Sequence, residues 1–133
     1  MAFVLDASVT AVWALLDESS LVADVAERRL KDEFAVVPRL WWYEVRNLLI
    51  VCERRNRITA EETAHFLRVL SAYPIRIEET EDEKSILQLA RKHQLSFYDA
   101  SYLAVAVRHR IALASLDKPL RAAAMAVGVP LLG

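Results

Sequence analysis

Four acidic residues of this sequence stand among apolar neighbours, where a carboxylate is unusual. Asp6 follows the apolar run Phe3–Leu5, and Asp99 lies in the stretch FYDASYLA. The tripeptide Asp-Ala-Ser begins at both of these acids. Glu44 lies in WWYEVRNLLIVC, and Asp117 lies in IALASLDKP. Because the same tripeptide recurs in a similar context, a common function for these acids has to be considered.

Each acid also has a purely structural explanation. Asp117 precedes Lys-Pro, which is typical of a helix N-cap, and Ser96 with Asp99 has the S-x-x-D spacing of an imperfect capping box. Ser8 could cap the first helix, with Asp6 merely ending a strand. Caps are common and catalytic acids are few, so each of these positions taken alone favours the structural explanation.

Glu44 changes this balance. It shares a helical face with Trp41 and Val45, so it is predicted to point inward with them. A buried glutamate needs a partner, and no single Lys or Arg has an obvious claim on this one. A divalent cation shared with the other three acids would stabilise all four carboxylates.

The types of these side chains indicate which cation and which chemistry. Carboxylates that lie within a few ångströms of each other repel, and a hard dication reverses that repulsion. A set of oxygen ligands without Cys or His predicts Mg²⁺ or Mn²⁺ rather than zinc. Such ions accept phosphate oxygens as further ligands, and proteins use them to activate water for the hydrolysis of phosphodiester bonds.

The elements that must position these acids follow from the hydrophobic pattern. Short apolar runs predict five strands, at Phe3–Leu5, Ala35–Val37, Ile75–Ile77, Ala112–Ala114 and Pro130–Leu132, which look buried on both faces. Helical periods fill the intervals, at 40–55, Thr59–Ser71, Thr80–His93, 98–109 and 119–127. The alternation predicts an α/β fold: one three-layer α/β/α domain over residues 1–133, with a mainly parallel sheet of about five strands. Acids at the carboxyl ends of such strands lie where functional crevices form.

Composition excludes several classes of protein. The net charge is −1, so the whole chain does not attract nucleic acid, and any contact with RNA needs a local patch. The only glycines are Gly128 and Gly133, which excludes a phosphate-binding glycine loop. The single cysteine, Cys52, excludes an internal disulfide and suits a reducing cytoplasm. No apolar run reaches the ~20 residues that cross a bilayer, and no basic residue precedes the apolar N-terminus as in a signal peptide.

The chain resembles the PIN-domain ribonucleases, and among them the VapC-type toxins of toxin-antitoxin pairs. Four blocks carry the resemblance: FVLDASV, then P-x-L-x-x-x-E-V-x-N-x-L from Pro38 to Leu49, L-x-x-Y-D-A-x-Y-L-A-x-A from Leu95 to Ala106, and S-L-D-K-P-L-R-x-A-A from Ser115. They occur in the family's order and extend over nearly the whole chain.

The resemblance implies a role for particular residues. The acidic quartet of the family falls on Asp6, Glu44, Asp99 and Asp117, with Asp6 and Asp99 as the principal Mg²⁺ ligands. Glu44 and Asp117 would complete the metal shell directly or through water. Ser8 would contact phosphate or cap its helix, and the cap is the preferred interpretation. Ser115 stands where many relatives carry Thr, and its hydroxyl could position phosphate or Asp117.

The resemblance also implies partners. It predicts a Mg²⁺-dependent endoribonuclease in the cytoplasm that cleaves tRNA or rRNA, that forms a homodimer and that a VapB-like antitoxin inhibits. Two alternatives stay open: a phosphohydrolase of the haloacid dehalogenase type, although that family has D-x-D where this chain has Asp-Ala-Ser, and a catalytically silent PIN-like binding module. Trp13, Trp41 and Trp42 could stack on RNA bases, but core or interface positions are favoured for them. The three histidines have no spacing that predicts catalysis.

Overall fold

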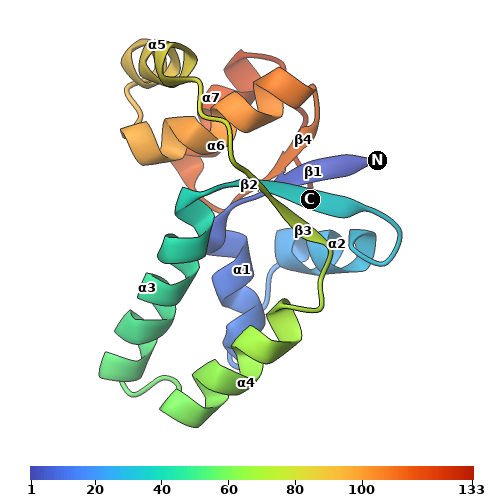
Figure 1. Ribbon diagram of the computed structural model, residues 1–133, viewed down its shortest axis with the longest axis vertical. Helices are drawn as coiled ribbons and strands as arrows, with labels where there is room; N and C mark the ends of the chain where they lie inside the picture. The colour runs from blue at the N-terminus through green and yellow to red at the C-terminus, as the bar shows by residue number, and fades with distance from the viewer.

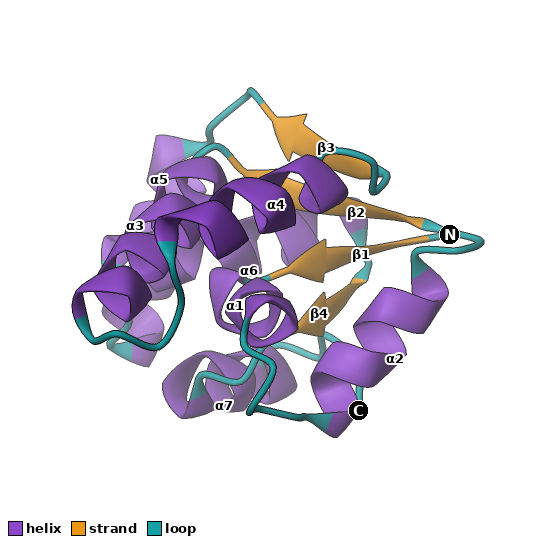
Figure 2. Ribbon diagram, turned by 90° about the horizontal axis from the view of Figure 1, so that it is seen from below, coloured by secondary structure: helices purple, strands orange, loops and turns teal.

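The computed structural model describes all 133 residues. The chain folds into a parallel sheet with a layer of helices on each face (Figure 1). The strands are β1 (Ala2–Leu5), β2 (Phe34–Pro38), β3 (Ile75–Glu78) and β4 (Ala112–Ala114). Their order in the sheet is β3-β2-β1-β4, and every pair is parallel. Figure 2 shows the strands running the same way, so their carboxyl ends lie together at one end of the sheet. The predicted three-layer α/β/α fold is confirmed.

The helices divide between the two faces of the sheet. One layer holds α1 (Ala7–Ala14), α2 (Leu21–Arg29), α3 (Leu40–Arg54) and α4 (Ala60–Leu70), below the sheet in Figure 1. The other layer holds α5 (Glu83–His93), α6 (Phe97–His109) and α7 (Lys118–Ala126). Buried apolar side chains from both layers and from the sheet form one continuous core. No helix is both long enough and apolar enough to cross a bilayer.

Two expectations about the sheet are wrong. The segment Pro130–Leu132 forms only an isolated bridge, between Leu113 and Leu131, so the sheet has four strands and not five. Pro130 has no N–H group to donate, although its carbonyl accepts from Leu113 N at 2.9 Å. The run Ile75–Ile77 is not buried on both faces, because β3 is an edge strand and Ile77 is 39% exposed.

The helix starts agree with the expected caps at some positions and differ at others. The Thr59 and Glu62 pair forms the predicted capping box of α4. The helix expected from Thr80 begins instead at Glu83, because the Asp82 side chain accepts a hydrogen bond from Ser85 N and caps it. Helix α2 has no counterpart among the expected helices, although Ser20 caps it through the backbone N–H of Ala23.

Candidate active site

Asp6 lies at the carboxyl end of β1, in the middle of the sheet. Its backbone is extended, and α1 begins at the next residue. The parallel register pairs Leu5 with Ala114, which brings Asp6 next to Ser115 at the end of β4. The Asp6 side chain is buried, with 5% of the residue exposed. The Oγ atoms of Ser8 and Ser115 both donate to Asp6 Oδ2, each at 2.7 Å. Two hydroxyl groups from distant parts of the sequence therefore orient this carboxylate.

The two serines also connect the start of α1 to the segment that follows β4. Ser8 Oγ accepts from Leu116 N at 3.1 Å, and Ser115 Oγ accepts from Asp117 N at 3.0 Å. The preferred interpretation of Ser8 as a helix cap is wrong. The N-cap residue of α1 is Asp6, and no side chain caps this helix, because the Ser8 hydroxyl is bound to the Asp6 carboxylate. Ser8 belongs structurally to the acid cluster.

Asp117 caps α7, as its place before Lys-Pro predicts. Its Oδ2 accepts from Leu120 N at 3.0 Å. Arg121, one turn into the same helix, donates through Nη1 to the carbonyl of Ser115 at 2.8 Å. The cap occupies one carboxylate oxygen and holds the side chain at the edge of the sheet. A structural role and a place in the acid cluster are therefore compatible at this residue.

Glu44 lies in the second turn of α3 and is half-buried, as its place on the face of Trp41 and Val45 predicts. Its partner is not a cation. Tyr102 Oη, from α6 in the opposite layer, donates to Glu44 Oε1 at 2.8 Å. None of the ion pairs in the structure includes Glu44 or any of the other three acids.

Asp99 lies in the first turn of α6. Ser96 caps this helix by accepting from Asp99 N at 3.0 Å, while the reciprocal half of the capping box is not formed. Asp99 is half-buried, and the aromatic residues Phe97 and Tyr98 directly before it are exposed. The predicted cap by Ser96 is confirmed, and the charges of Asp117 and Asp6 act on the Asp99 carboxylate.

Electrostatic repulsion shows that the acids share one neighbourhood. Burial raises the pKa of the Asp6 carboxyl, hydrogen bonds from Ser115 and Ser8 oppose this, and the charge of Asp117 adds to it. Burial also raises the pKa of Glu44, which the Tyr102 hydrogen bond opposes and the charges of Asp6 and Asp99 reinforce. The pKa of Asp99 is raised by burial and then by the charges of Asp117 and Asp6, which a hydrogen bond from Ser96 opposes. Asp6 after β1, Glu44 in α3, Asp99 in α6 and Asp117 before α7 therefore influence one another at the carboxyl ends of the strands.

The donor set of this cluster suits a hard dication, but the side chains are not drawn together as a finished ligand shell. All the donors are oxygen atoms, which Mg²⁺ and Mn²⁺ prefer. Three of the carboxyls have a raised pKa through burial and mutual repulsion, which a dication would relieve. No three acidic, His or Cys side chains lie close enough to hold one ion as they stand. An ion shared by the four acids would need side-chain rotation or intervening water, and Mg²⁺ usually retains water in proteins.

A groove of about 420 Å³ opens beside the acid cluster, between the start of α3, the end of β3, and helices α5 and α6. None of the four acids lines it. Tyr43 and Tyr98 do, and these residues directly precede Glu44 and Asp99 in the chain. Half of the lining residues are apolar, and Tyr43 and Tyr98 are 65% and 61% exposed. The groove therefore lies next to the cluster through the residues that precede Glu44 and Asp99.

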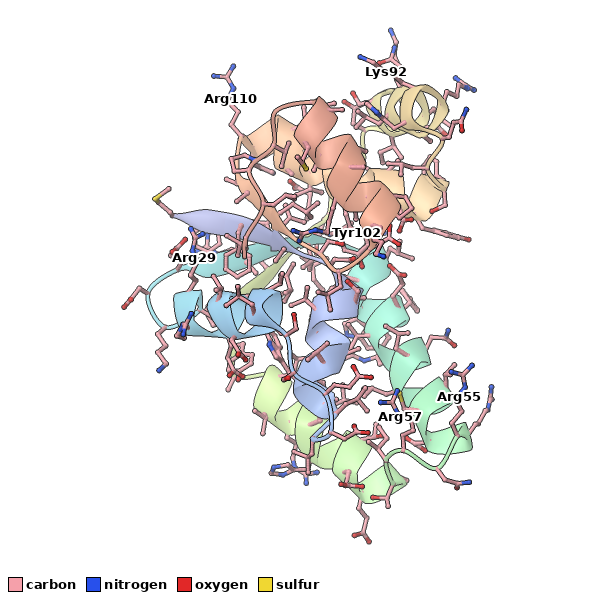
Figure 3. All side chains as sticks on the ribbon, turned by 180° about the vertical axis from the view of Figure 1, so that it is seen from behind. Arg29, Arg55, Arg57, Lys92, Tyr102 and Arg110 are labelled. Carbon is pink, nitrogen blue, oxygen red and sulfur yellow. The ribbon has the colours of Figure 1, made fainter.

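Sequence reasoning missed Tyr102. Figure 3 shows it where the layer of α6 and α7 meets the start of α3, whereas the labelled basic residues Arg55, Lys92 and Arg110 project outward elsewhere. A signal for it existed, because Tyr102 follows Asp99 by three residues and so shares its helical face.

Two of the three tryptophans lie in or against the core, the position that their apolar neighbours in the sequence favoured over RNA stacking. Trp41 is buried, with Nε1 donating to Thr10 Oγ1 at 3.0 Å, and Trp13 is half-buried, with Nε1 donating to the Ala23 carbonyl at 3.0 Å. Trp42 is 42% exposed, and the Arg46 guanidinium covers its ring at 3.8 Å.

Comparison with known proteins identifies the family of this chain. No curated protein matches it significantly. Among solved structures, PAE2754 from Pyrobaculum aerophilum superposes with a TM-score of 0.72 at 25% identity, covering 92% of this chain and 84% of that one. Mycobacterium tuberculosis VapC20, a Sarcin-Ricin loop cleaving toxin, superposes with a TM-score of 0.61 at 17% identity, covering 92% of this chain and 95% of that one. The model of the PIN domain family matches residues 3–125, and the chain belongs to that family.

Proposed function

We propose that this protein is an endoribonuclease that depends on Mg²⁺, with Mn²⁺ as a substitute, and that it is the toxin of a VapBC-like toxin-antitoxin pair in the cytoplasm. One observation carries the proposal. In a chain of the PIN domain family, four acids from separate elements interact at the carboxyl edge of the sheet, and no Lys or Arg forms an ion pair with any of them. The fold of VapC20, a toxin that cleaves the Sarcin-Ricin loop, supports the toxin assignment by similarity.

Each residue of the cluster has a role in this proposal. Asp6 and Asp99 would hold the metal ion, and Glu44 and Asp117 would complete its shell directly or through water. The bound ion would supply positive charge at the scissile phosphate and an activated water for hydrolysis. Ser8 and Ser115 hold the Asp6 carboxylate in a fixed orientation through Oδ2. Glu44 or Asp117 would orient the attacking water, because each is a carboxylate at the edge of the cluster.

The partners follow from the same surface. The RNA substrate, tRNA or rRNA, would present a phosphate to the acids. We propose that the antitoxin covers the apolar groove beside Tyr43 and Tyr98 and presents a basic side chain to the carboxylates, since a cluster of acids attracts Arg. A homodimer is proposed as well, because the resemblance to the VapC-type toxins implies one.

The central test compares the cleavage of total RNA by wild type and Asp6→Asn, each with Mg²⁺, with Mn²⁺ and with EDTA. We expect metal-dependent cleavage by wild type, none above background with EDTA, and a rate reduced by about 10²- to 10³-fold with Asp6→Asn. The matched control is Ser101→Ala, in the other Asp-Ala-Ser tripeptide, because the Ser101 hydroxyl donates to the Tyr98 carbonyl and not to an acid. Cleavage that persists with EDTA, or an undiminished rate with Asp6→Asn, would reject the mechanism.

The alternatives predict different outcomes of the same assay. A phosphohydrolase of the haloacid dehalogenase type would hydrolyse small phosphate esters and leave RNA intact, and the PIN family match speaks against it. A silent PIN-like module would bind RNA without cleaving it under any metal condition. Adding a small phosphate ester and an RNA-binding measurement to the assay distinguishes the three functions.

A further inference from the structure

Tyr102 is the bulkiest fully buried side chain in the protein, and its hydroxyl points into the acid cluster. Its exposed fraction is 0%. A buried phenol needs a hydrogen-bond partner, and this one donates to Glu44 Oε1 at 2.8 Å. Burial raises the pKa of Tyr102, and the negative charges of Asp6 and Glu44 raise it further. The ring of Tyr102 is therefore fixed in the core while its hydroxyl is bound to Glu44.

The hydrogen bond joins the two helical layers at the edge of the sheet. Tyr102 belongs to α6, in the layer of α5 and α7, whereas Glu44 belongs to α3 in the opposite layer. Tyr102 follows Asp99 by three residues on α6, so the two side chains lie on the same face of one rigid helix. A single hydroxyl thus couples the position of Glu44 to that of Asp99.

Glu44 needs such a restraint. The charges of Asp6 and Asp99 act on it, and it is only half-buried, so it has room to turn away from them toward solvent. Glutamate has three rotatable side-chain bonds, and like charges disfavour keeping it near the other acids. No cation is paired with it in the structure. The Tyr102 hydroxyl is the one side-chain group that donates a hydrogen bond to it.

We propose that Tyr102 is a positioning residue, whose hydroxyl holds the Glu44 carboxylate within the acid cluster against the repulsion of Asp6 and Asp99. This inference rests on the proposed function and adds to it a residue outside the acidic quartet. Without the hydroxyl, Glu44 turns toward solvent, and the remaining acids bind a divalent ion more weakly. The ring of Tyr102 supports the core, whereas its oxygen serves the site.

The test is Tyr102→Phe, which removes only the hydroxyl. We expect the affinity for Mn²⁺, measured by calorimetry on the RNA-free protein, to fall by about 10- to 100-fold, the usual effect of losing a group that orients a metal ligand. We expect kcat for RNA cleavage to fall by a similar factor with little change in KM. The melting temperature should stay within about 5 °C of wild type, because the ring still fills the core. The matched control is Tyr73→Phe, which removes a hydroxyl bound to Glu27 Oε2 at 2.9 Å outside the acid cluster, and which should behave as wild type.

A double-mutant cycle separates positioning from packing. In a Glu44→Ala background the hydroxyl has no carboxylate to hold, so adding Tyr102→Phe should change Mn²⁺ affinity less than twofold. The same loss in both backgrounds would show a general packing effect and would overturn the inference. Should Tyr102→Phe fail to fold, Glu44→Asp breaks the contact from the other side by shortening the acid, and an unchanged Mn²⁺ affinity there would also overturn it.

The outcomes separate this inference from the proposed function. If wild type binds Mn²⁺ and cleaves RNA while Tyr102→Phe equals it in both, only the inference fails. If wild type neither binds Mn²⁺ nor cleaves RNA, the proposed function fails and the inference fails with it.

Discussion

The two Asp-Ala-Ser tripeptides have identical sequences and are used differently. Asp6 ends a strand in extended conformation, and Ser8 donates to its carboxylate. Asp99 is already inside α6, and Ser101 donates to the Tyr98 carbonyl of its own helix. The first tripeptide supplies an acid together with a hydroxyl that orients it, whereas the second supplies only an acid.

The reason is the point at which each helix begins. Within a helix, residues two apart do not face each other, so Ser101 is turned away from Asp99. Asp6 precedes its helix, so the chain turns between it and Ser8, and the hydroxyl reaches back to the carboxylate. The neighbouring β4 then adds Ser115 to the same oxygen. An acid at a strand end can thus be oriented by side chains from two elements, while an acid within a helix depends on other helices.

The largest difference in cleavage rate is expected between substitutions of Asp6 and of Asp99, the acids of the two tripeptides. Asp6→Asn should reduce RNA cleavage by about 10²- to 10³-fold, the magnitude typical of losing one group that stabilises transition-state charge. Asp99→Asn should reduce the cleavage rate by a smaller factor, because Asp99 is half-buried and no hydroxyl from another element orients its carboxylate. Single-turnover rates at saturating Mg²⁺ measure both. Asp24→Asn, an exposed acid in the first turn of α2, is the control. A larger loss with Asp99→Asn than with Asp6→Asn would contradict the comparison.

A smaller difference in cleavage rate is expected between substitutions of Ser8 and of Ser101, the serines of the two tripeptides. Ser8→Ala should lower the rate of RNA cleavage by about tenfold, because it removes one of the two hydroxyls that orient Asp6 Oδ2. Ser101→Ala should leave the rate near that of wild type, because its hydroxyl binds a backbone carbonyl. The measurement is kcat with a short RNA substrate at fixed Mg²⁺. Equal rates for the two variants would mean that the orientation of Asp6 by Ser8 has no catalytic value.

The smallest effect concerns stability and pH. The folded-state pKa values of Asp6 and Asp99 are raised, so the folded protein holds these protons more tightly than the unfolded chain does. Their contribution to stability therefore falls as pH rises from the ordinary carboxyl range through the raised folded values. Without divalent cations, Asp6→Asn should melt a few degrees above wild type at pH 7 and lose this advantage toward pH 4.

Asp99→Asn should show a smaller version of the same pattern, because Asp6 is the more deeply buried acid. Thermal melts followed by circular dichroism across that pH range provide the test. A stabilisation that does not change with pH would point to packing and not to charge.

Local sequence signals predicted much of the fold. The caps at Thr59, Ser96 and Asp117 were predictable because a side chain there binds a backbone N–H only three residues away. The apolar runs of β1, β2 and β4 were predictable because these strands are largely buried. The exposure of β3 was not, because β3 lies at one end of the order β3-β2-β1-β4, whereas β4 at the other end is bridged by Leu131. The cap of α5 was missed because two acceptable caps, Thr80 and Asp82, stand close together in the chain.

The amino-acid sequence by itself determined which acids the protein carries and that each stands near the end of a strand or the start of a helix, because those properties depend on composition and short-range periodicity. The tertiary structure alone decided which hydroxyls reach them. Ser115 meets Asp6 through the parallel register of β1 and β4, across 109 positions of chain. Tyr102 meets Glu44 because two helices from opposite layers meet at the edge of the sheet. Contacts of this kind depend on strand order and layer packing, which no local pattern encodes.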